Sequence, residues 1–474
     1  MILSVQQMDA NQFYDVCIVG SGPAGMTLAV ALHREGKRVL VLEAGGREFS
    51  TQSQDVYEGR VLGEEYQGLQ ATRLRYLGGT SNHWGGNCRP LDEIDFERLD
   101  AFPETEWPIS RSDLDPYGAM ARDILALDGN FEDKALSDGV VEADFKVSDP
   151  VVRFGEKYID LFDGARDLSI CLEANLTRLD TSDGRITAAH FRDFDGNSGQ
   201  ARASVFVLAC GGVENSRLLL HFNDISEGNI VRQAETLGRY WMEHPQIGFA
   251  GDLVMFEFFE NKKNYTLDKR TQQDLNILNC RLRMLPEPLE RDGRVQQLVA
   301  DLACRAPAIA STLRNWLGRN LVCGAALPAV VEMAPRPENR IALSETDRDF
   351  FDIPSPILHL EYGPEVYETV RQTMLKVGEH LARTDQGRIR IVDWLANNEK
   401  PPEGTIWGGS HHMGGTRMSR QSGDGIVDPD LKVWGQDNLY IAGSSVFPSG
   451  GYANPTYTIV QLSLRLADHI KQRL

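Results

Sequence analysis

Residues 14–43 read YDVCIVGSGPAGMTLAVALHREGKRVLVLE, and this stretch decides the fold. Residues 14–19 form a short β-rich run, residues 26–36 have helical spacing, and residues 38–42 resemble a second buried strand. The order strand, glycine turn, helix, strand and acid is that of a βαβ unit of about 30 residues. We therefore expect a dinucleotide-binding unit at this end of the chain.

Each glycine of the turn has its own reason. Gly20 permits the tight turn, Gly22 lets the backbone approach a pyrophosphate, and Gly25 lets the helix pack closely on the strand. Ser21 lies between the first two, and the helix N-terminus faces the phosphates. Glu43 is placed to accept hydrogen bonds from a ribose 2′-OH, which makes NADP a poor fit. The pattern does not separate FAD from NAD, and a glycine turn without a ligand is the alternative.

Composition limits the class of protein. The chain has 474 residues, enough for about three domains or for two large ones. Its 49 Lys and Arg against 68 Asp and Glu give a net charge of −19, which argues against nucleic acid and against basic docking on a membrane. A hydrophobic content of 42% excludes disorder as the overall state.

Cysteine usage and apolar runs favour a reduced compartment. The seven cysteines show no CxxC spacing, so we expect neither a disulfide framework, nor a zinc site, nor another metal site; they are Cys17, Cys88, Cys171, Cys210, Cys280, Cys304 and Cys323. No apolar run approaches the about 20 residues of a membrane span, and no signal peptide is evident. We expect a cytoplasmic protein.

Other segments give coarser signals. Residues 166–208 alternate like a small β-meander, and a strand at 205–209 runs into a helix start. Residues 365–383 predict an amphipathic helix, and residues 458–474 predict a C-terminal one.

Four blocks of sequence together resemble the glucose–methanol–choline (GMC) oxidoreductase family. Besides the N-terminal glycine turn they are LGGTSNHWGGNCRPLD at 77–92, VFVLACGGVENSRLLL at 205–220, and HHMGGTRM at 411–418 with the following 438–470. The resemblance extends from about residue 14 to 474 and is loose between 225 and 405. It implies FAD as the cofactor and oxidation of an alcohol, with hydride passing to flavin N5.

The resemblance also implies a domain plan. We expect an α/β fold with a Rossmann-like FAD-binding domain assembled from residues 1–100, 166–224 and 406–474. Residues 101–165 and 225–405 would form an α+β substrate-binding domain with an antiparallel sheet.

The resemblance assigns catalytic residues. The family pattern His-x-x-Gly-x-x-Arg-Met begins at His411, which makes His411 the base, whereas His412 is out of register. Asn454 matches the second active-site position. Imidazole titrates near neutral pH, and an amide can hold a developing oxyanion without titrating. The alternative is that both histidines are structural.

The loop at 78–86 is expected near the flavin. Gly78, Gly79 and Asn82 would contact it through their backbone. His83 falls where pyranose oxidases of this family carry a covalently linked histidine, but the following residues differ from that pattern, so we favour non-covalent packing.

Further positions are assigned by the same resemblance. Leu176 would lie beside adenine, and Gly443 would end the last strand close to the cofactor. Pro455 and Thr456 follow Asn454 in the same block. His244, in the block MEHP, is interpreted as structural rather than catalytic.

The substrate is less determined than the chemistry. The family resemblance favours a polyol-like molecule, namely a sugar, glycoside or aminocyclitol, in secondary metabolism for example. The acidic surface favours a cationic substrate such as an aminoglycoside. The partner would be an electron acceptor such as oxygen, a quinone or another carrier, and an oligomer is compatible with the sequence. Alternatives are a non-redox FAD lyase, a sterol or other alcohol oxidase, a NAD-dependent dehydrogenase and a non-catalytic protein.

Overall fold

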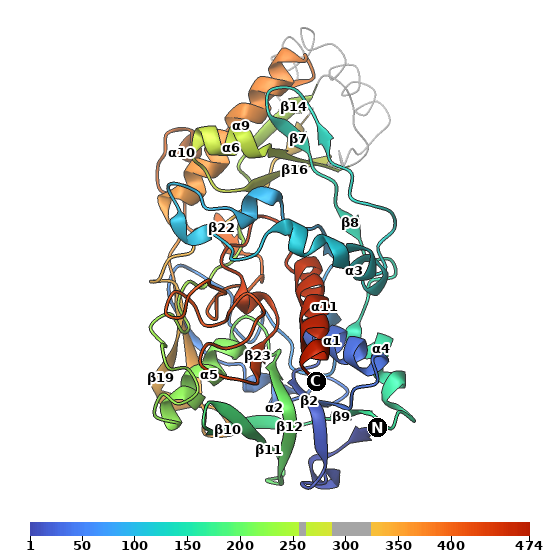
Figure 1. Ribbon diagram of the computed structural model, residues 1–474. Helices are drawn as coiled ribbons and strands as arrows, with labels where there is room; N and C mark the ends of the chain where they lie inside the picture. Colours follow the sequence, from blue (N-terminus) through green and yellow to red (C-terminus); the bar gives the residue numbers. More distant parts are fainter. Residues whose placement is uncertain (256–261, 287–323) are drawn as a thin grey trace, which may run out of the picture.

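The computed structural model describes residues 1–255, 262–286 and 324–474. Cys304, Cys323 and part of the predicted segment 225–405 lie outside these residues. Two large sheets divide the molecule, one around β2 and β12 at the bottom of Figure 1 and one around β14 and β16 at the top. Both termini lie beside the lower sheet (Figure 1).

The lower sheet has eight strands in the order β1-β9-β3-β2-β12-β11-β10, with β23 also paired to β12. Strand β12 belongs to two patterns: its first half pairs antiparallel with β11, and its second half pairs parallel with β2 and β23. The expected meander at 166–208 is confirmed for β10, β11 and β12. The strands are β1 (Ile2–Leu3), β2 (Phe13–Val19), β3 (Val39–Leu42), β9 (Leu168–Cys171), β10 (Asn175–Ser182), β11 (Arg185–Arg192), β12 (Ser198–Leu208) and β23 (Leu439–Ile441).

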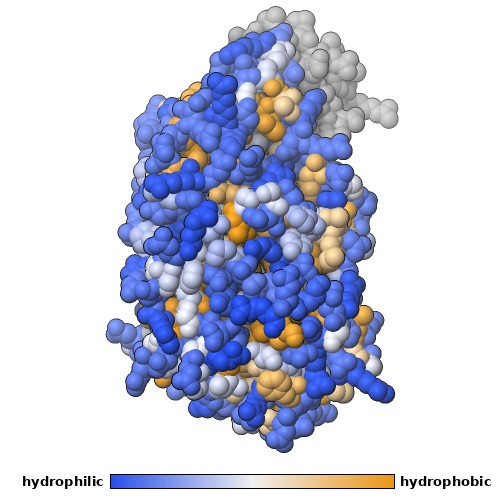
Figure 2. Space-filling model, in the orientation of Figure 1, coloured by the Kyte–Doolittle hydropathy of each residue, from blue (hydrophilic) through white to orange (hydrophobic). Residues whose placement is uncertain are grey.

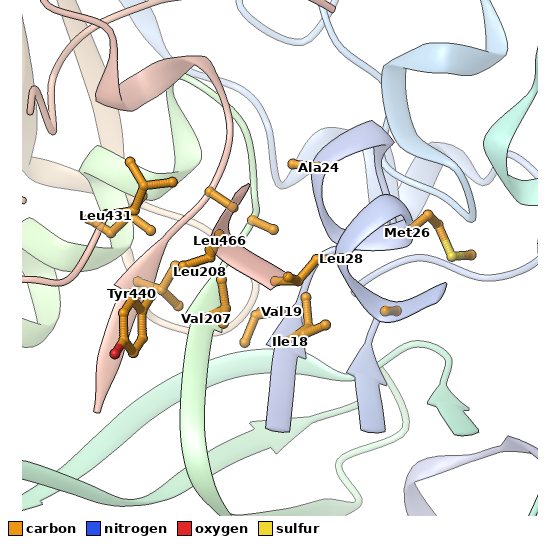
Figure 3. Packing of buried hydrophobic residues seen from close by; sticks show 14 of the residues in the cluster. Ile18, Val19, Ala24, Met26, Leu28, Val207, Leu208, Leu431, Tyr440 and Leu466 are labelled. Carbon is orange, nitrogen blue, oxygen red and sulfur yellow. The ribbon is translucent and has the colours of Figure 1, made fainter. Parts of the chain in front are cut away.

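The parallel strands are buried on both faces, which explains their continuous apolar runs. Helices α1 (Pro23–Arg34) and α11 (Thr456–Arg473) pack against each other beside this sheet. Figure 3 shows Ile18 of β2, Leu28 of α1, Val207 of β12 and Leu466 of α11 in one cluster, and all four are at most 1% exposed. The predicted C-terminal helix is confirmed.

The upper sheet has ten strands and is antiparallel between its paired strands. Helix α9 (Pro364–Arg383) contacts five of these strands, as the predicted amphipathic helix requires. It buries Val366, Val370, Met374, Val377 and Leu381 at helical spacing. The strands are β6 (Lys134–Ala135), β7 (Val140–Glu142), β13 (Pro245–Ile247), β14 (Gly251–Met255), β15 (Lys263–Leu267), β16 (Cys280–Pro286), β17 (Gly324–Ala326), β18 (Ala329–Val331), β21 (Gly387–Ile391) and β22 (Ile406–Gly408).

Smaller elements complete the described part of the chain. One sheet joins β4 (Arg60–Gly63), β19 (Arg340–Arg348) and β20 (Pro354–Leu360), and another joins β5 (Asn87–Cys88) to β8 (Lys146–Val147). The remaining α-helices are α2 (Thr51–Asp55), α3 (Gly118–Ile124), α4 (Phe154–Phe162), α5 (Glu214–Ile225), α6 (Lys269–Leu275) and α10 (Asp393–Ala396).

Several contacts join elements that the sequence assigns to different domains, and the domain boundaries stay a prediction. Helix α4 contacts α1 and β9, and the Tyr457 hydroxyl of α11 donates to the Gly118 carbonyl of α3 at 3.1 Å. Strand β19 lies against α5, whereas β22 joins the upper sheet. Each helix or strand buries its apolar face against a neighbouring element, and the position of an element in the sequence does not determine which neighbour that is.

The face in Figure 2 is mainly hydrophilic, with small scattered hydrophobic patches. Among the described helices, none is long and apolar enough to cross a bilayer. The five described cysteines are free thiols, and no described group of His, Cys, Asp and Glu could hold a metal ion.

Candidate active site

A cavity of about 550 Å³ opens where the parallel strands of the lower sheet end. Its wall is built from distant parts of the chain, and ligands of α/β sheets commonly bind at such strand ends. Predicted site residues on this wall are Gly20, Ser21, Gly22, Glu43, Gly79, His83, Leu176, His411, Gly443, Asn454, Pro455 and Thr456.

The glycine turn follows the steric reasons expected for it. A Cβ on Gly25 would lie 1.9 Å from the Gly20 carbonyl oxygen, and Gly20 itself has φ +105°. A Cβ on Gly22 would meet no atom within 4 Å, so this position faces open space. Helix α1 begins just after Gly22 without a side-chain cap. Its first N–H groups can therefore bind a phosphate in the cavity.

Ser21 fixes the acid at the end of β3. Buried Glu43 accepts hydrogen bonds through Oε2 from the Ser21 amide at 3.0 Å and from its hydroxyl at 2.5 Å. Its Oε1 accepts from the Gly45 amide at 2.8 Å. The Ser21 oxygen also accepts the Gly78 amide at 2.9 Å. A carboxylate has about four acceptor positions, so Glu43 can still accept a ribose hydroxyl.

The loop at 78–86 only partly faces the cavity. Gly79 and His83 line it, whereas Gly78 and Asn82 are not on its wall, and contact of these two with a flavin stays a prediction. A Cβ on Gly78 would lie 2.5 Å from the Gly155 amide nitrogen, and the Asn82 amide donates to the Leu77 carbonyl at 2.8 Å. Their role here is to shape the loop.

His411 lies between two polar side chains at the wall of the cavity. Its Nε2 is 3.1 Å from Asn454 Nδ2, and its Nδ1 is 2.8 Å from Nδ1 of His244. His244 Nε2 lies 3.3 Å from the Gly450 carbonyl oxygen. The sequence paired His411 with Asn454 correctly in space, but it did not predict that His244 would touch the second nitrogen of His411.

One arrangement of protons satisfies all three contacts. If His244 Nε2–H donates to Gly450, His244 Nδ1 accepts from His411 Nδ1–H, and His411 Nε2 then accepts from the Asn454 amide. Burial lowers the pKa of His411 well below its ordinary value, and then the neighbouring His244 lowers it further. Burial likewise lowers the pKa of His244 to about 4. Both rings are therefore neutral at pH 7, with the lone pair of His411 on Nε2.

A buried carboxyl group holds this pair of histidines by their backbone. Glu243 Oε1 accepts from the amides of His244 at 2.7 Å and His411 at 2.8 Å. Its Oε2 accepts from the Tyr66 hydroxyl at 2.6 Å, and that hydroxyl lies 3.0 Å from His412 Nε2. Burial raises the pKa of Glu243 to about 6 and lowers that of His412 to about 3.

Sequence reasoning missed Glu243 and Tyr66. The only available signal was the block MEHP, in which Glu243 stands beside His244. Acidic side chains are rarely fully buried unless they are paired, so a buried Glu243 would need a partner such as Tyr66. Tyr66 lies in a loop with no signal at all. Asn454 carries a further feature: its Oδ1 is buried and has no partner within the described residues.

Comparison with known proteins identifies what this chain is similar to. Residues 335–463 match the family model described as GMC oxidoreductase, and residues 13–61 match the one described as FAD binding domain. The fructose dehydrogenase large subunit of Gluconobacter japonicus is 22% identical, over 96% of this chain and 97% of its own length. The C-glycoside 3-oxidase of Microbacterium trichothecenolyticum is 25% identical, over 84% of this chain and 75% of its own.

The fold has a solved counterpart. Pyridoxine 4-oxidase from Mesorbium loti superimposes with a TM-score of 0.59 at 16% identity, covering 96% of this chain and 99% of that one. The glycine turn, the cavity and these matches define an FAD-dependent oxidoreductase that acts on an alcohol group of a small molecule and needs an electron acceptor. The chain thus carries a match to the GMC oxidoreductase model and a match to the FAD binding domain model, and it is similar over most of its length to the fructose dehydrogenase subunit.

Proposed function

We propose that this enzyme oxidises a CH–OH group of a polyol-like small molecule, such as a sugar or glycoside, to a carbonyl. The observation that carries the proposal is the pair His411 and Asn454, 3.1 Å apart on the wall of a cavity that begins at a dinucleotide turn. Two of the relatives, a fructose dehydrogenase subunit and a C-glycoside 3-oxidase, act on a sugar and on a glycoside, which supports this substrate class.

The chain fits FAD by its own features. The open space at Gly22 and the uncapped start of α1 suit a pyrophosphate, and Glu43 retains acceptor capacity for a ribose hydroxyl. Leu176, Gly443, Pro455 and Thr456 line the same cavity and would pack along the cofactor. His83 would pack beside it without a covalent bond. When bound, FAD supplies the hydride acceptor.

The protein's part of the reaction is proton transfer and positioning. The substrate hydroxyl would replace the Asn454 amide at His411 Nε2 and give its proton to that nitrogen. Asn454 would then donate to the substrate oxygen and stabilise its developing charge. The proton gained by His411 can be shared with His244 Nδ1, which is 2.8 Å from His411 Nδ1. Glu243 holds the backbone of both rings in register.

An anaerobic visible spectrum tests the proposal. The purified protein would be recorded before and after adding sugars, glycosides and aminocyclitols. Bleaching of the flavin bands by one compound is the expected result and names its class. A flavin that no alcohol reduces would contradict the proposal and favour a non-redox lyase. Reoxidation of the reduced flavin with oxygen or a quinone would then identify the electron acceptor. The cytoplasmic location of the protein stays a prediction.

The pH dependence follows from the two depressed histidine pKa values. Protonation removes the base, and both pKa values lie below the ordinary His value of about 6.5. Flavin reduction should therefore be constant at neutral pH and fall only below pH 6.5, as measured by anaerobic stopped-flow spectroscopy. An acid limb centred above pH 7 would contradict this arrangement.

His244 should matter through His411. His244→Leu removes the acceptor for His411 Nδ1–H, and loss of a hydrogen bond to a charged group should slow flavin reduction roughly 10- to 100-fold. His244→Asn restores an amide acceptor near that position and should recover part of the rate. Flavin content, measured from the visible absorbance, should not change. Equal rates for wild type and His244→Leu would remove His244 from the mechanism.

A further inference from the structure

Arg281 is a buried cation that forms no ion pair with any residue that the structure describes. It lies on β16, exposes only 7% of its surface, and stacks over the Phe145 ring at 4.1 Å. Within residues 1–255, 262–286 and 324–474 its guanidinium has no ion-pair or hydrogen-bond partner, and its Nε is buried. Burial lowers the pKa of Arg281 to about 9, and then Arg283 adds to this effect.

The carboxyl groups on neighbouring elements have other partners. Arg89 pairs with Asp92 and, at 2.6 Å, with Asp133. Glu332, next to the strand that pairs with β16, accepts from the backbone amides of Asn279 at 3.0 Å and Gly451 at 3.1 Å. None of these acids forms an ion pair with Arg281 in the described chain.

The surroundings of Arg281 lead to the catalytic pair. Phe145 lies 6.2 Å from the ring of Tyr452, whose buried hydroxyl has no partner among the described residues. Tyr452 precedes Asn454 by two positions, and Asn454 Oδ1 is unpartnered in the same way. Burial lowers the pKa of His411 and of His244 most, and the charge of Arg281 lowers both further. Arg281 is therefore close enough to both histidines for its charge to act on them, and two further buried polar atoms without described partners lie on the segment that carries Asn454.

Two more cations belong to this region. Arg283 lies two positions along β16, on the same side of the strand, and its Nε is also buried without a described partner. The pKa of Lys262 is lowered to about 8 by burial, then by Arg283 and Arg281. A buried charge without a partner is unfavourable, and a guanidinium fork matches the two oxygens of a carboxylate or phosphate.

We infer that the substrate carries an anionic group, a carboxylate or a phosphate, which Arg281 binds while His411 and Asn454 hold the carbinol. This inference rests on the proposed function and narrows its substrate class to polyols that carry an acid group. It also replaces the cationic substrate favoured by the net charge of −19, because a buried Arg281 determines the local field more than the surface does.

Binding and turnover are tested separately. Thermal unfolding of the holoenzyme is measured with D-glucuronate and D-glucose 6-phosphate, each against D-glucose, and anaerobic flavin reduction is measured with the same compounds. D-glucuronate or D-glucose 6-phosphate is expected to raise the melting temperature, whereas D-glucose does not. The acid that gives the larger shift shows whether the site prefers a carboxylate or a phosphate. If D-glucose stabilises as much as both acids, the inference is overturned.

Arg281 variants connect the effect to this residue. Arg281→Met should abolish the acid-specific stabilisation and lower kcat/KM for the preferred acid at least about 100-fold, while FAD content stays the same. Without an added acid it should melt no lower than wild type, because it removes an unpartnered buried charge. Arg281→Lys keeps the charge but not the fork and should be intermediate, and exposed Arg270→Met is the control. Unchanged acid selectivity in either Arg281 variant would overturn the inference.

The outcome does not depend on turnover. If no compound reduces the flavin, the proposed function fails, but acid-specific stabilisation that requires Arg281 still supports the anion site. If polyols reduce the flavin and the acids give no Arg281-dependent stabilisation, the proposed function stands and the anion site is wrong.

Discussion

His411→Ala should slow flavin reduction by about 10²- to 10⁴-fold, the usual effect of losing a general base. The expected loss follows from geometry, because His411 lines the cavity and its Nε2 is 3.1 Å from Nδ2 of Asn454, which lines it too. The change removes a side chain whose ring contacts are Asn454 and His244, whereas its backbone amide still donates to Glu243. FAD should therefore remain bound. Anaerobic stopped-flow reduction by a substrate from the panel measures the rate.

Two controls make this result specific. His359→Ala changes a half-buried histidine of β20 and should reduce its flavin at the wild-type rate. His412→Ala tests the neighbour, whose Nε2 faces the Tyr66 hydroxyl at 3.0 Å rather than Asn454. A wild-type rate in His411→Ala together with a large loss in His412→Ala would transfer the role of base to His412.

The fold could be predicted because its decisive signals are local. Gly25 needs to be glycine because a Cβ there would meet the Gly20 carbonyl oxygen, and Gly20 itself has a positive φ. Parallel strands buried on both faces also have a recognisable apolar run. The pairing of β4 with β20 joins residues almost 300 positions apart, and nothing in either strand names its partner. For the same reason, the sequence does not reveal that α4 packs on α1 and β9, that α3 contacts α11, or that β19 lies against α5.

The residues of the site could be predicted only where they belong to a sequence motif. His411 and Asn454 were assigned from their motifs, but Tyr66 and Glu243 reach them from separate segments. For Arg281 the sequence pattern itself is misleading about burial. The alternation CRLRM at 280–284 suggests that the arginines of β16 face solvent, yet that side of the strand is covered by Phe145 and the region of Tyr452. Burial of the polar side of a strand is a tertiary property.

Gly25→Ala and Gly22→Ala should separate folding from cofactor binding, because the two glycines differ in what a methyl group would meet. At Gly25 the new Cβ would lie 1.9 Å from the Gly20 carbonyl oxygen, so α1 must shift away from β2. We expect Gly25→Ala to lose at least about 1–3 kcal/mol of stability, as overpacking does, and to lose FAD with it. Thermal unfolding of the apoprotein measures the first effect.

Gly22→Ala should give the reverse pattern. Its φ of −68° suits alanine and its Cβ would meet open space, so the apoprotein should melt like wild type. That space is where the pyrophosphate would lie, and a methyl group in it should weaken FAD binding by about 10- to 100-fold, equivalent to 1–3 kcal/mol. Quenching of flavin fluorescence on titration with apoprotein measures the affinity. If Gly22→Ala binds FAD as tightly as wild type, the turn does not hold the pyrophosphate, because a methyl group at this position would occupy the space that the pyrophosphate needs.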